Sequence, residues 1–414
     1  MRAFVNFGTP FAYDTVMLAM IKGTILRTGF LLLLLLLFTR EIPAQWILQG
    51  GLIDEQVHRG IELTYNMDYV EADRTFDSVI RESPSHPSGY FYKAMVNFWR
   101  AVTNTDNTNY DEAYREQLNL CIDRAEKLLD TNDLDLAGLF YKGAALGMRA
   151  RIFAIRPNWQ DAIGILLGDA KEGIKYLNKL EEKLPGNGDI IFGRGLYNYY
   201  VEAVKEDNPG LSSVIGFFAT GNKRVGLEML EYAGKNATYS RTEAMYELMK
   251  INYIYEKNFS HSYDFARILA MKYPNNSAFL HYLGFCQVSL NLTQQYDSTY
   301  RVILARSQQR KEGYTIKQAR EAMYFIGQAF LLDHNGNLDS ALYYLYNCNQ
   351  ISYKLTPNEV TWWIAKSELL MGEAYDARGD RKNALMMYNR VMQMKDVSGA
   401  HGDAQRYINS PFRR

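Results

Sequence analysis

Beyond residue 50, apolar residues recur at spacings of three and four along most of the chain. The windows Tyr90 to Val102, Leu139 to Phe153 and Ala244 to Tyr255 are clear cases. This spacing places the apolar residues on one face of an α-helix, whereas a half-buried strand would alternate apolar and polar residues. No such alternating run occurs in the sequence. The pattern therefore predicts an all-α protein.

The helical segments carry a repeated order of small, aromatic and proline residues. In the first copy, Gly60 is followed after twelve residues by Ala72, after four more by Phe76, and after eight more by Pro84. Gly60 and Ala72 are small, which lets two helices cross closely, and Phe76 fills the space beside them. Pro84 cannot continue the hydrogen-bond ladder, so it ends the second helix. The spacing predicts a pair of antiparallel helices.

A second copy of the repeat lies near the end of the chain. It has small residues at Gly372 and Ala384 and aromatic residues at Tyr375 and Tyr388. Gly379 separates the two halves, since glycine readily adopts the turn conformation that ends a helix. We expect the first helix over about residues 360 to 378 and the second over about 381 to 394.

A third copy supplies a test of the period. It contains Tyr253, has Ser262 in the small position and ends at Pro274. If another pair follows, a small residue is expected ten positions later, and Gly284 occupies that position. The same step leads from Pro84 to Ala94 and from Pro185 to Gly195.

These copies resemble the tetratricopeptide repeat (TPR) family over most of residues 53 to 395. The resemblance implies a right-handed superhelical solenoid of about seven TPR-like helix pairs, which exceeds the three or so repeats that a stable array needs. It implies little about the ligand.

The middle of the chain interrupts the repeat. Residues Glu206 to Gly210 break a helix, and the following stretch, Leu211 to Leu230, reads LSSVIGFFATGNKRVGLEML. This stretch is similar to the middle of the inclusion-clearance TPR proteins of the mitochondrial outer membrane, which implies an adaptor role without catalytic residues. We expect TPR-like repeats over 45–204, an irregular insertion and helix over 205–240, further repeats over 241–398 and a C-terminal cap or tail over 399–414.

The N-terminal 44 residues have the order of a secretory signal. Lys22 and Arg27 precede the apolar run Gly29 to Phe38, and the small residue Ala44 follows it. The run is shorter than the about 20 residues that a transmembrane helix needs. We expect cleavage after Ala44, no membrane span in the mature chain, and export to the periplasm or cell envelope. An uncleaved anchor in the inner membrane is the alternative, and the true start could be Met17 or Met20.

Composition argues against several classes of function. The 46 basic residues equal the 46 acidic ones, which disfavours a chain-wide affinity for nucleic acid. The six histidines are scattered without a metal-binding spacing, and no Gly-x-Ser-x-Gly motif occurs. The stretch Asp333 to Asp339 begins like a calcium loop but lacks the later glutamate, so we interpret it as a turn. The sequence thus predicts no catalytic residues, no metal and no cofactor.

Candidate contacts for a partner lie on the first helices of the pairs, which line the concave surface of such a solenoid. Aromatic side chains there provide contact area at low entropic cost, and polar side chains provide hydrogen bonds. The candidates are Asn97, Arg100, Asn198, Tyr199, Lys250, Asn252 and Trp363. The basic stretch Arg306 to Arg320 is either a solvated loop and helix start or a contact for an acidic partner or anionic surface.

Three hypotheses for function follow from these patterns. The first is an exported, non-catalytic TPR scaffold that binds a protein or peptide in its concave groove. The second is an enzyme or ligand-binding protein with its site in the irregular middle, residues 186 to 235. The third is an envelope adaptor that associates with a membrane through Val214 to Phe218.

Overall fold

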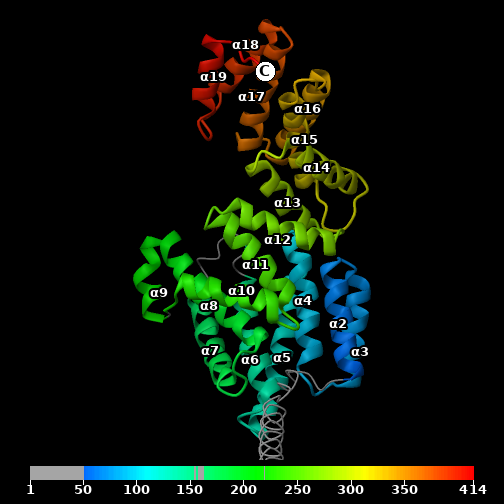
Figure 1. Ribbon diagram of the computed structural model, residues 1–414, viewed down its shortest axis with the longest axis vertical. Helices are drawn as coiled ribbons and strands as arrows, with labels where there is room; N and C mark the ends of the chain where they lie inside the picture. Colours follow the sequence, from blue (N-terminus) through cyan, green and yellow to red (C-terminus); the bar gives the residue numbers. More distant parts are fainter. Residues whose placement is uncertain (1–50, 153–154, 157–162, 219) are drawn as a thin grey trace, which may run out of the picture. The chain divides into compact units, whose positions relative to one another are not determined.

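The computed structural model describes residues 51–152, 155–156, 163–218 and 220–414. The expected signal sequence and its cleavage after Ala44 lie outside these residues. The described residues form helices and turns, with no strand among them (Figure 1). The prediction of an all-α solenoid is confirmed.

Consecutive helices pack against one another in chain order. The pairs are α2 (Leu52–Tyr65) with α3 (Tyr69–Glu82), α4 (Ser88–Thr103) with α5 (Asp111–Thr131), α6 (Leu136–Arg151) with α7 (Ile163–Glu181), α8 (Gly188–Asp207) with α10 (Lys223–Asn236), α11 (Arg241–Ile254) with α12 (Phe259–Lys272), α13 (Ser277–Ser289) with α14 (Thr293–Gln308), α15 (Ile316–Leu332) with α16 (Leu338–Leu355), and α17 (Trp362–Ala377) with α18 (Arg381–Gln393). Each pair also packs on the next, which is the construction of a helical-repeat protein.

Glycine and an aromatic ring meet where the two helices of a pair cross. A Cβ atom built on Gly60 would lie 2.3 Å from Cζ of Phe76, and one on Gly372 would lie 2.4 Å from Cε1 of Tyr388. In the same way, a Cβ atom built on Gly284 would lie 2.8 Å from Cζ of Tyr300. In all three pairs the glycine precedes the ring by sixteen residues. The shared spacing reflects one crossing geometry repeated along the chain.

The remaining repeat residues lie in or beside these crossings. Ala72 and Ala384 are fully buried, whereas Tyr253 and Tyr375 are partly buried against the main core. Pro84 and Pro274 each follow a second helix, two residues after α3 and α12 end. A proline there stops the helix because it has no N–H for the next hydrogen bond.

The irregular middle consists of a helix pair with an inserted segment. A 3₁₀ turn, Pro209–Leu211, and the short helix α9, Ser212–Phe218, stand between α8 and α10. The helices α8 and α10 approach so closely that backbone meets backbone. A Cβ atom on Gly226 would lie 2.6 Å from the backbone nitrogen of Tyr199 and 2.9 Å from the carbonyl oxygen of Gly195.

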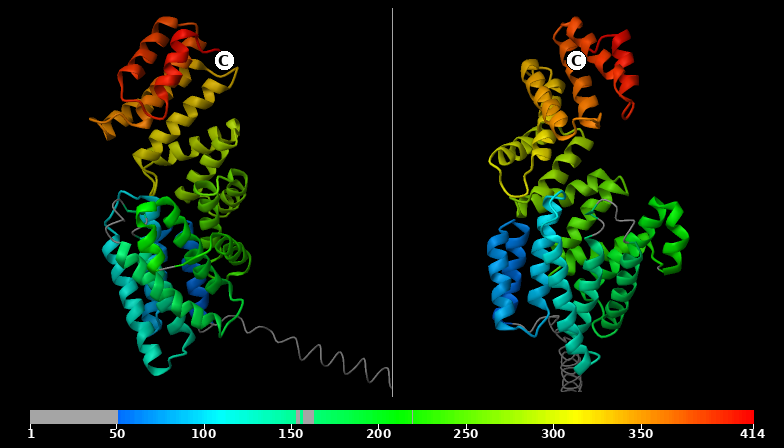
Figure 2. Two further views of the ribbon diagram at one scale, coloured as in Figure 1. Left: turned by 90° about the vertical axis from the view of Figure 1, so that its left-hand side faces the viewer. Right: turned by 180° about the vertical axis from the view of Figure 1, so that it is seen from behind.

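The first helices of the chain also contact helices more than 200 residues later. The side chain of Asn276 donates a 2.8 Å hydrogen bond to the carbonyl of Tyr65, and Lys272 pairs with Glu62 at 2.8 Å. Lys317 forms an ion pair with Asp106 at 2.6 Å. Figures 1 and 2 show α2 and α4, in blue and cyan, beside α11 and α12, in green. These contacts join the beginning of the segment 52–317 to its end. Much of the inner side of this segment is therefore packed core.

The last residues cap the array. Helix α19, Ala400–Asn409, packs on α17 and α18 and buries Ala400 and Ala404. Arg381 donates hydrogen bonds to the carbonyls of Tyr407 and Ile408, at 2.9 and 2.6 Å. Within the described part of the chain, no helix has the length and apolar character needed to cross a membrane.

Candidate functional site

A buried group of charged side chains joins the helices of the closed part. Arg151, at the end of α6, pairs with Glu243 at 2.9 Å and also with Glu247, both on α11. The side chain of Glu247 is fully buried and that of Glu243 is 6% exposed. A buried charge is tolerated only when partners replace its water, so this cluster depends on complete pairing.

Four further side chains complete the cluster. Trp99 and Tyr65 donate hydrogen bonds to Oε1 of Glu243, at 2.6 and 3.2 Å. Tyr200 donates to Glu247 at 2.5 Å, and Lys250 pairs with the same carboxylate at 3.3 Å. Burial alone would raise the pKa of Glu247, but the positive charges of Lys250 and Arg151 outweigh it and lower the pKa to about 2. The two carboxylates thereby join α2, α4, α6 and α8 to α11.

Two of the predicted contact residues, Asn97 and Arg100, lie on α4. Asn97 is buried, and its Oδ1 accepts a 3.3 Å hydrogen bond from Arg100. Arg100 is engaged by Asp73 at 2.8 Å and by Glu312 at 3.7 Å. Both side chains therefore already have partners within the chain.

The candidates of the middle are also engaged internally. The amides of Asn198 and Asn252 donate to the carbonyls of Arg194 and Leu248, four residues earlier in their own helices. Tyr199 is fully buried, with its hydroxyl donating to Glu256 at 2.5 Å. Asn252 also lines a pocket, described next.

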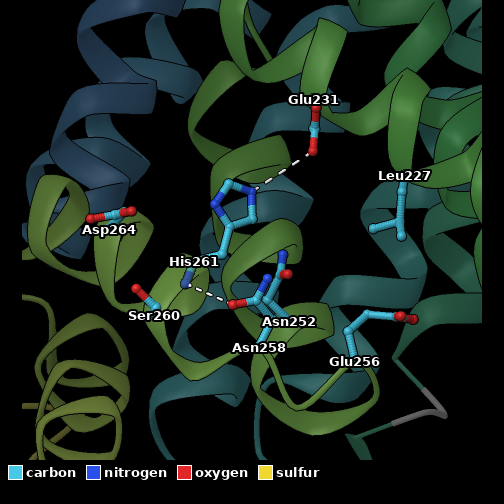
Figure 3. Close-up of a pocket in the computed structure, with 8 residues that line it drawn as sticks. All are labelled: Leu227, Glu231, Asn252, Glu256, Asn258, Ser260, His261 and Asp264. Atoms are coloured by element: carbon cyan, nitrogen blue, oxygen red, sulfur yellow. Dashed lines mark hydrogen bonds and ion pairs between the residues drawn. The ribbon is translucent and has the colours of Figure 1, made fainter. Parts of the chain in front are cut away.

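A shallow hollow of about 620 Å³ lies between α10, α11 and the start of α12 (Figure 3). Its lining is Leu227, Glu231, Asn252, Glu256, Asn258, Ser260, His261 and Asp264. Glu231 approaches His261 to 3.7 Å, and Asn258 accepts a 3.2 Å hydrogen bond from the backbone N–H of His261. Asn258 thereby caps α12, so much of this polar lining serves the helix itself.

A group of aromatic side chains is gathered on the first helices of two later pairs. Tyr324 on α15 packs on Trp362 and Trp363 at the start of α17, with ring centroids 5.0 and 5.6 Å apart. The guanidinium of Arg320, on α15, lies 4.7 Å from the ring of Trp363. We call Arg320, Tyr324, Trp362 and Trp363 the α15–α17 surface. Both tryptophans and Arg320 remain partly exposed.

An ion pair lies between this surface and the preceding helix pair. Nδ1 of His281, on α13, is 3.0 Å from Oε1 of Glu321, which follows Arg320. Burial would lower the pKa of His281, but the carboxylate of Glu321 outweighs it and raises the pKa above 6.5. The charge of Glu321 is therefore taken up by His281.

A second carboxyl with a shifted pKa lies on α17. Burial, reinforced by the negative charge of Asp403, raises the pKa of Glu373 from 4.5 to about 7. The other charges near it are Arg406, Lys366 and Asp376. The folded protein therefore binds a proton at Glu373 more tightly than the unfolded chain does.

This shift predicts a pH dependence of stability. The contribution of Glu373 is fully present below pH 4.5 and is lost as the pH rises to about 7. It corresponds to about 3 kcal/mol of unfolding free energy. Urea unfolding between these pH values should show the decline in the wild-type protein and a much smaller one in Glu373→Gln. Equal declines in both would contradict the assignment.

The described residues contain no group of three histidine, cysteine, aspartate or glutamate side chains placed to hold a metal ion. Cys121, Cys286 and Cys348 are buried and unbridged. In the stretch once compared with a calcium loop, Asn337 caps α16 by accepting from Ser340, and Arg414 donates to the carbonyls of Phe330 and Leu331 just before it.

The α15–α17 surface was only partly predictable. Trp363 is among the candidates predicted from the sequence. Arg320 is part of the predicted basic stretch Arg306 to Arg320, but nothing in the sequence distinguishes it from the other cations there. In that stretch Arg306 donates to Pro274 and Tyr314, at 2.5 and 2.8 Å, and Lys317 pairs with Asp106. Because Pro274 and Asp106 are distant in sequence from Arg306 and Lys317, the sequence alone does not show that these two cations are engaged.

Comparisons with known proteins bear on the fold alone. No protein-family model and no curated protein sequence matches the chain. Among solved structures, yeast Tom70 is similar at 10% identity, with 84% of this chain and 88% of that chain covered and a TM-score of 0.34. A human IFIT1 dimer with PPP-AAAA matches at 15% identity, 79% and 69% coverage and a TM-score of 0.28. The TPR domain of P58(IPK) matches at 13% identity, 88% and 100% coverage and a TM-score of 0.23. The chain is thus similar to TPR-containing structures, and its TPR-like fold is established by its own repeated helix pairs.

Proposed function

We propose that the chain is an exported, non-catalytic TPR scaffold that binds a segment of another protein in its concave groove, with the α15–α17 surface as the principal contact. The observation that carries this proposal is the pair of partly exposed tryptophans, Trp362 and Trp363, beside the partly exposed Arg320. Tryptophan and arginine are enriched among the residues that dominate binding energy at protein interfaces.

The position of this surface follows from how the rest of the chain is packed. The large side chains of Trp99 on α4 and Tyr246 on α11 are buried against Phe279 of α13. On α13 and α17, the aromatics Tyr282, Phe285, Trp362 and Trp363 keep part of their surface exposed. A partner segment can therefore contact aromatic side chains on these two helices.

The finer parts of the proposal rest on sequence and chemistry. Export to the periplasm or envelope rests on the signal-like order of residues 1–44. The absence of catalysis is supported by the buried charged cluster, whose groups are saturated by one another. The shallow hollow of Figure 3 lacks a nucleophile paired with a base, which an acyl- or group-transfer site would need.

The test is retention of the natural partner by variants of this surface. Trp363→Ala removes the ring that Arg320 and Tyr324 pack on, so we expect at least a tenfold loss of partner affinity. Binding would be measured with protein purified from its own host, against the co-purifying protein at increasing concentrations. Tyr343→Ala is the matched control, because Tyr343 is 62% exposed on α16 outside this surface.

Two outcomes would count against the proposal. One is the absence of any saturable protein partner for the wild-type chain. The other is an equal loss of affinity in Trp363→Ala and Tyr343→Ala, which would place the contact elsewhere.

A further inference from the structure

Arg320 is a half-buried arginine without a direct carboxylate partner. Within the described ranges, no ion pair and no hydrogen bond reaches its guanidinium, and its Nε atom is buried without a partner. The charge of Glu321, the next residue, acts on Arg320 only through space, and this carboxylate is engaged by His281 at 3.0 Å. The guanidinium lies 4.7 Å from the ring of Trp363.

This lack of partners sets Arg320 apart from other buried arginines of the chain. Arg100 and Arg156 have side chains 11% and 10% exposed, and each contacts a carboxylate at 2.8 Å. Arg151 has two carboxylate partners. An arginine that loses water without gaining a carboxylate destabilises the fold, and burial accordingly lowers the pKa of Arg320. A cation–π contact recovers only part of this loss.

The terminal nitrogens of the guanidinium are available for hydrogen bonds. The Nε atom is buried, whereas the two terminal nitrogens are not, and their N–H donors lie in the plane of the group. A carboxylate can accept two parallel hydrogen bonds from these two nitrogens. The partly exposed ring of Trp362 packs on Trp363 and offers apolar contact for the residues next to the carboxylate.

We propose that Arg320, beside the ring of Trp363, receives the side-chain carboxylate of an aspartate or glutamate in an extended acidic segment of the partner, with apolar neighbours of that residue packing on Trp362. This inference rests on the proposed function. It adds the chemistry of the segment that the scaffold recognises.

The local charge favours one carboxylate over a polyanion. Of the other cations of the same stretch, Lys317 and Arg306 are engaged by Asp106 and by Pro274 and Tyr314, and Arg310 and Lys311 are exposed in the turn between α14 and α15. Nucleic acid binding depends on several cations that neutralise successive phosphates. One guanidinium beside an aromatic ring matches a single carboxylate flanked by apolar residues.

Defined peptides test the inference with the chain as its host produces it. The probes are fluorescein-labelled twelve-residue peptides with a central Glu or Asp between Leu and Phe, each with an amidated C-terminus, and the same peptides with Gln or Asn. We expect the acidic peptides to bind at least about tenfold more tightly, as for hydrogen bonds to charged groups. A third set, with Gln at the centre and a free C-terminus, separates a terminal carboxylate from a side-chain one.

The variants separate recognition from folding. Arg320→Gln should reduce affinity for the acidic peptide about tenfold to 100-fold and leave the Gln peptide unaffected. It should keep or raise Tm, because it removes an unpaired charge that is partly buried. Arg267→Gln on α12 is the control, since Arg267 is exposed and the same charge is removed. It should change neither affinity nor Tm.

Each of the following outcomes contradicts either the inference on Arg320 or the proposed scaffold function. If the natural partner binds but Arg320→Gln binds it as the wild type does, the inference fails and the scaffold function stands. If Arg320→Gln lowers Tm markedly, Arg320 has a structural role and the inference fails. Tighter binding of the Gln peptide with a free C-terminus would show that Arg320 receives a terminal carboxylate and not a side-chain one. If neither peptides nor any protein bind saturably, the proposed function itself fails.

Discussion

Replacing Gly226 with alanine is expected to destabilise the protein by about 3 kcal/mol, near the upper end of overpacking costs. The added Cβ would lie 2.6 Å from the backbone nitrogen of Tyr199 and 2.9 Å from the carbonyl oxygen of Gly195. Both obstacles are backbone atoms inside α8, so no side-chain rotation can relieve the contact. The two helices would have to separate, and the buried Tyr199 and Leu230 beside the crossing would lose packing.

Gly234 provides a matched control on the same helix. A Cβ there would lie 3.6 Å from Cδ1 of Leu248 and 3.8 Å from Cγ of Met245, which is ordinary contact. Gly234→Ala should therefore stabilise α10 by about 0.5–1 kcal/mol, because alanine is the better helix former. Urea unfolding of both variants checks the pair of expectations. Equal effects of the two substitutions would show that α8 and α10 do not cross as described.

Replacing Arg151 with methionine is expected to cost about 3–5 kcal/mol, the range found when one partner of a buried ion pair is removed. Glu243 and Glu247 would remain in the interior with their principal cation gone, and Lys250 reaches Glu247 only at 3.3 Å. Methionine keeps much of the side-chain volume, so the loss measures charge pairing more than a cavity.

The control for this substitution is Arg224→Met on α10. Arg224 is 88% exposed and pairs with Glu228 one turn later, which is an interaction of little net worth. Its unfolding free energy should change by less than about 1 kcal/mol. If Arg151→Met proves equally mild, the cluster does not hold α6 to α11.

The repeat itself could be predicted from the sequence because its determinants are local. Gly60 and Phe76, or Gly372 and Tyr388, belong to one helix pair and lie sixteen residues apart. A fixed spacing within one pair leaves a periodic trace in the chain. The boundaries of the last pair agree with this, since α17 and α18 begin and end within two residues of their expected positions.

The contacts between distant helices left no such trace. Tyr65, Arg151 and Glu243 meet through helix pairs that are about 90 residues apart, and none of the three carries a motif. Whether a polar residue is free depends on these contacts too. Arg100 and Arg320 look alike in the sequence, but Arg100 has Asp73 and Glu312, whereas the described residues offer Arg320 no carboxylate.

The polar candidates of the first helices show the same limit. Asn198 and Asn252 were chosen as hydrogen-bond donors for a partner, yet each amide donates to a carbonyl of its own helix. Asparagine side chains often compete for backbone groups in this way. The ring of Trp363 packs on Trp362 and Tyr324 and remains partly exposed.

Site-specific photo-crosslinking tests most directly whether the α15–α17 surface binds a protein segment. The photoreactive residue p-benzoylphenylalanine would replace Trp363 in one version of the chain and Tyr343 in another, each produced in its own host and irradiated there. Position 343 is exposed on α16 outside this surface, so it reports chance encounters. We expect a discrete adduct with one protein at position 363, linked through an acidic segment of that protein, and no comparable adduct at position 343. The absence of an adduct at position 363, or the same adducts at both positions, would contradict it.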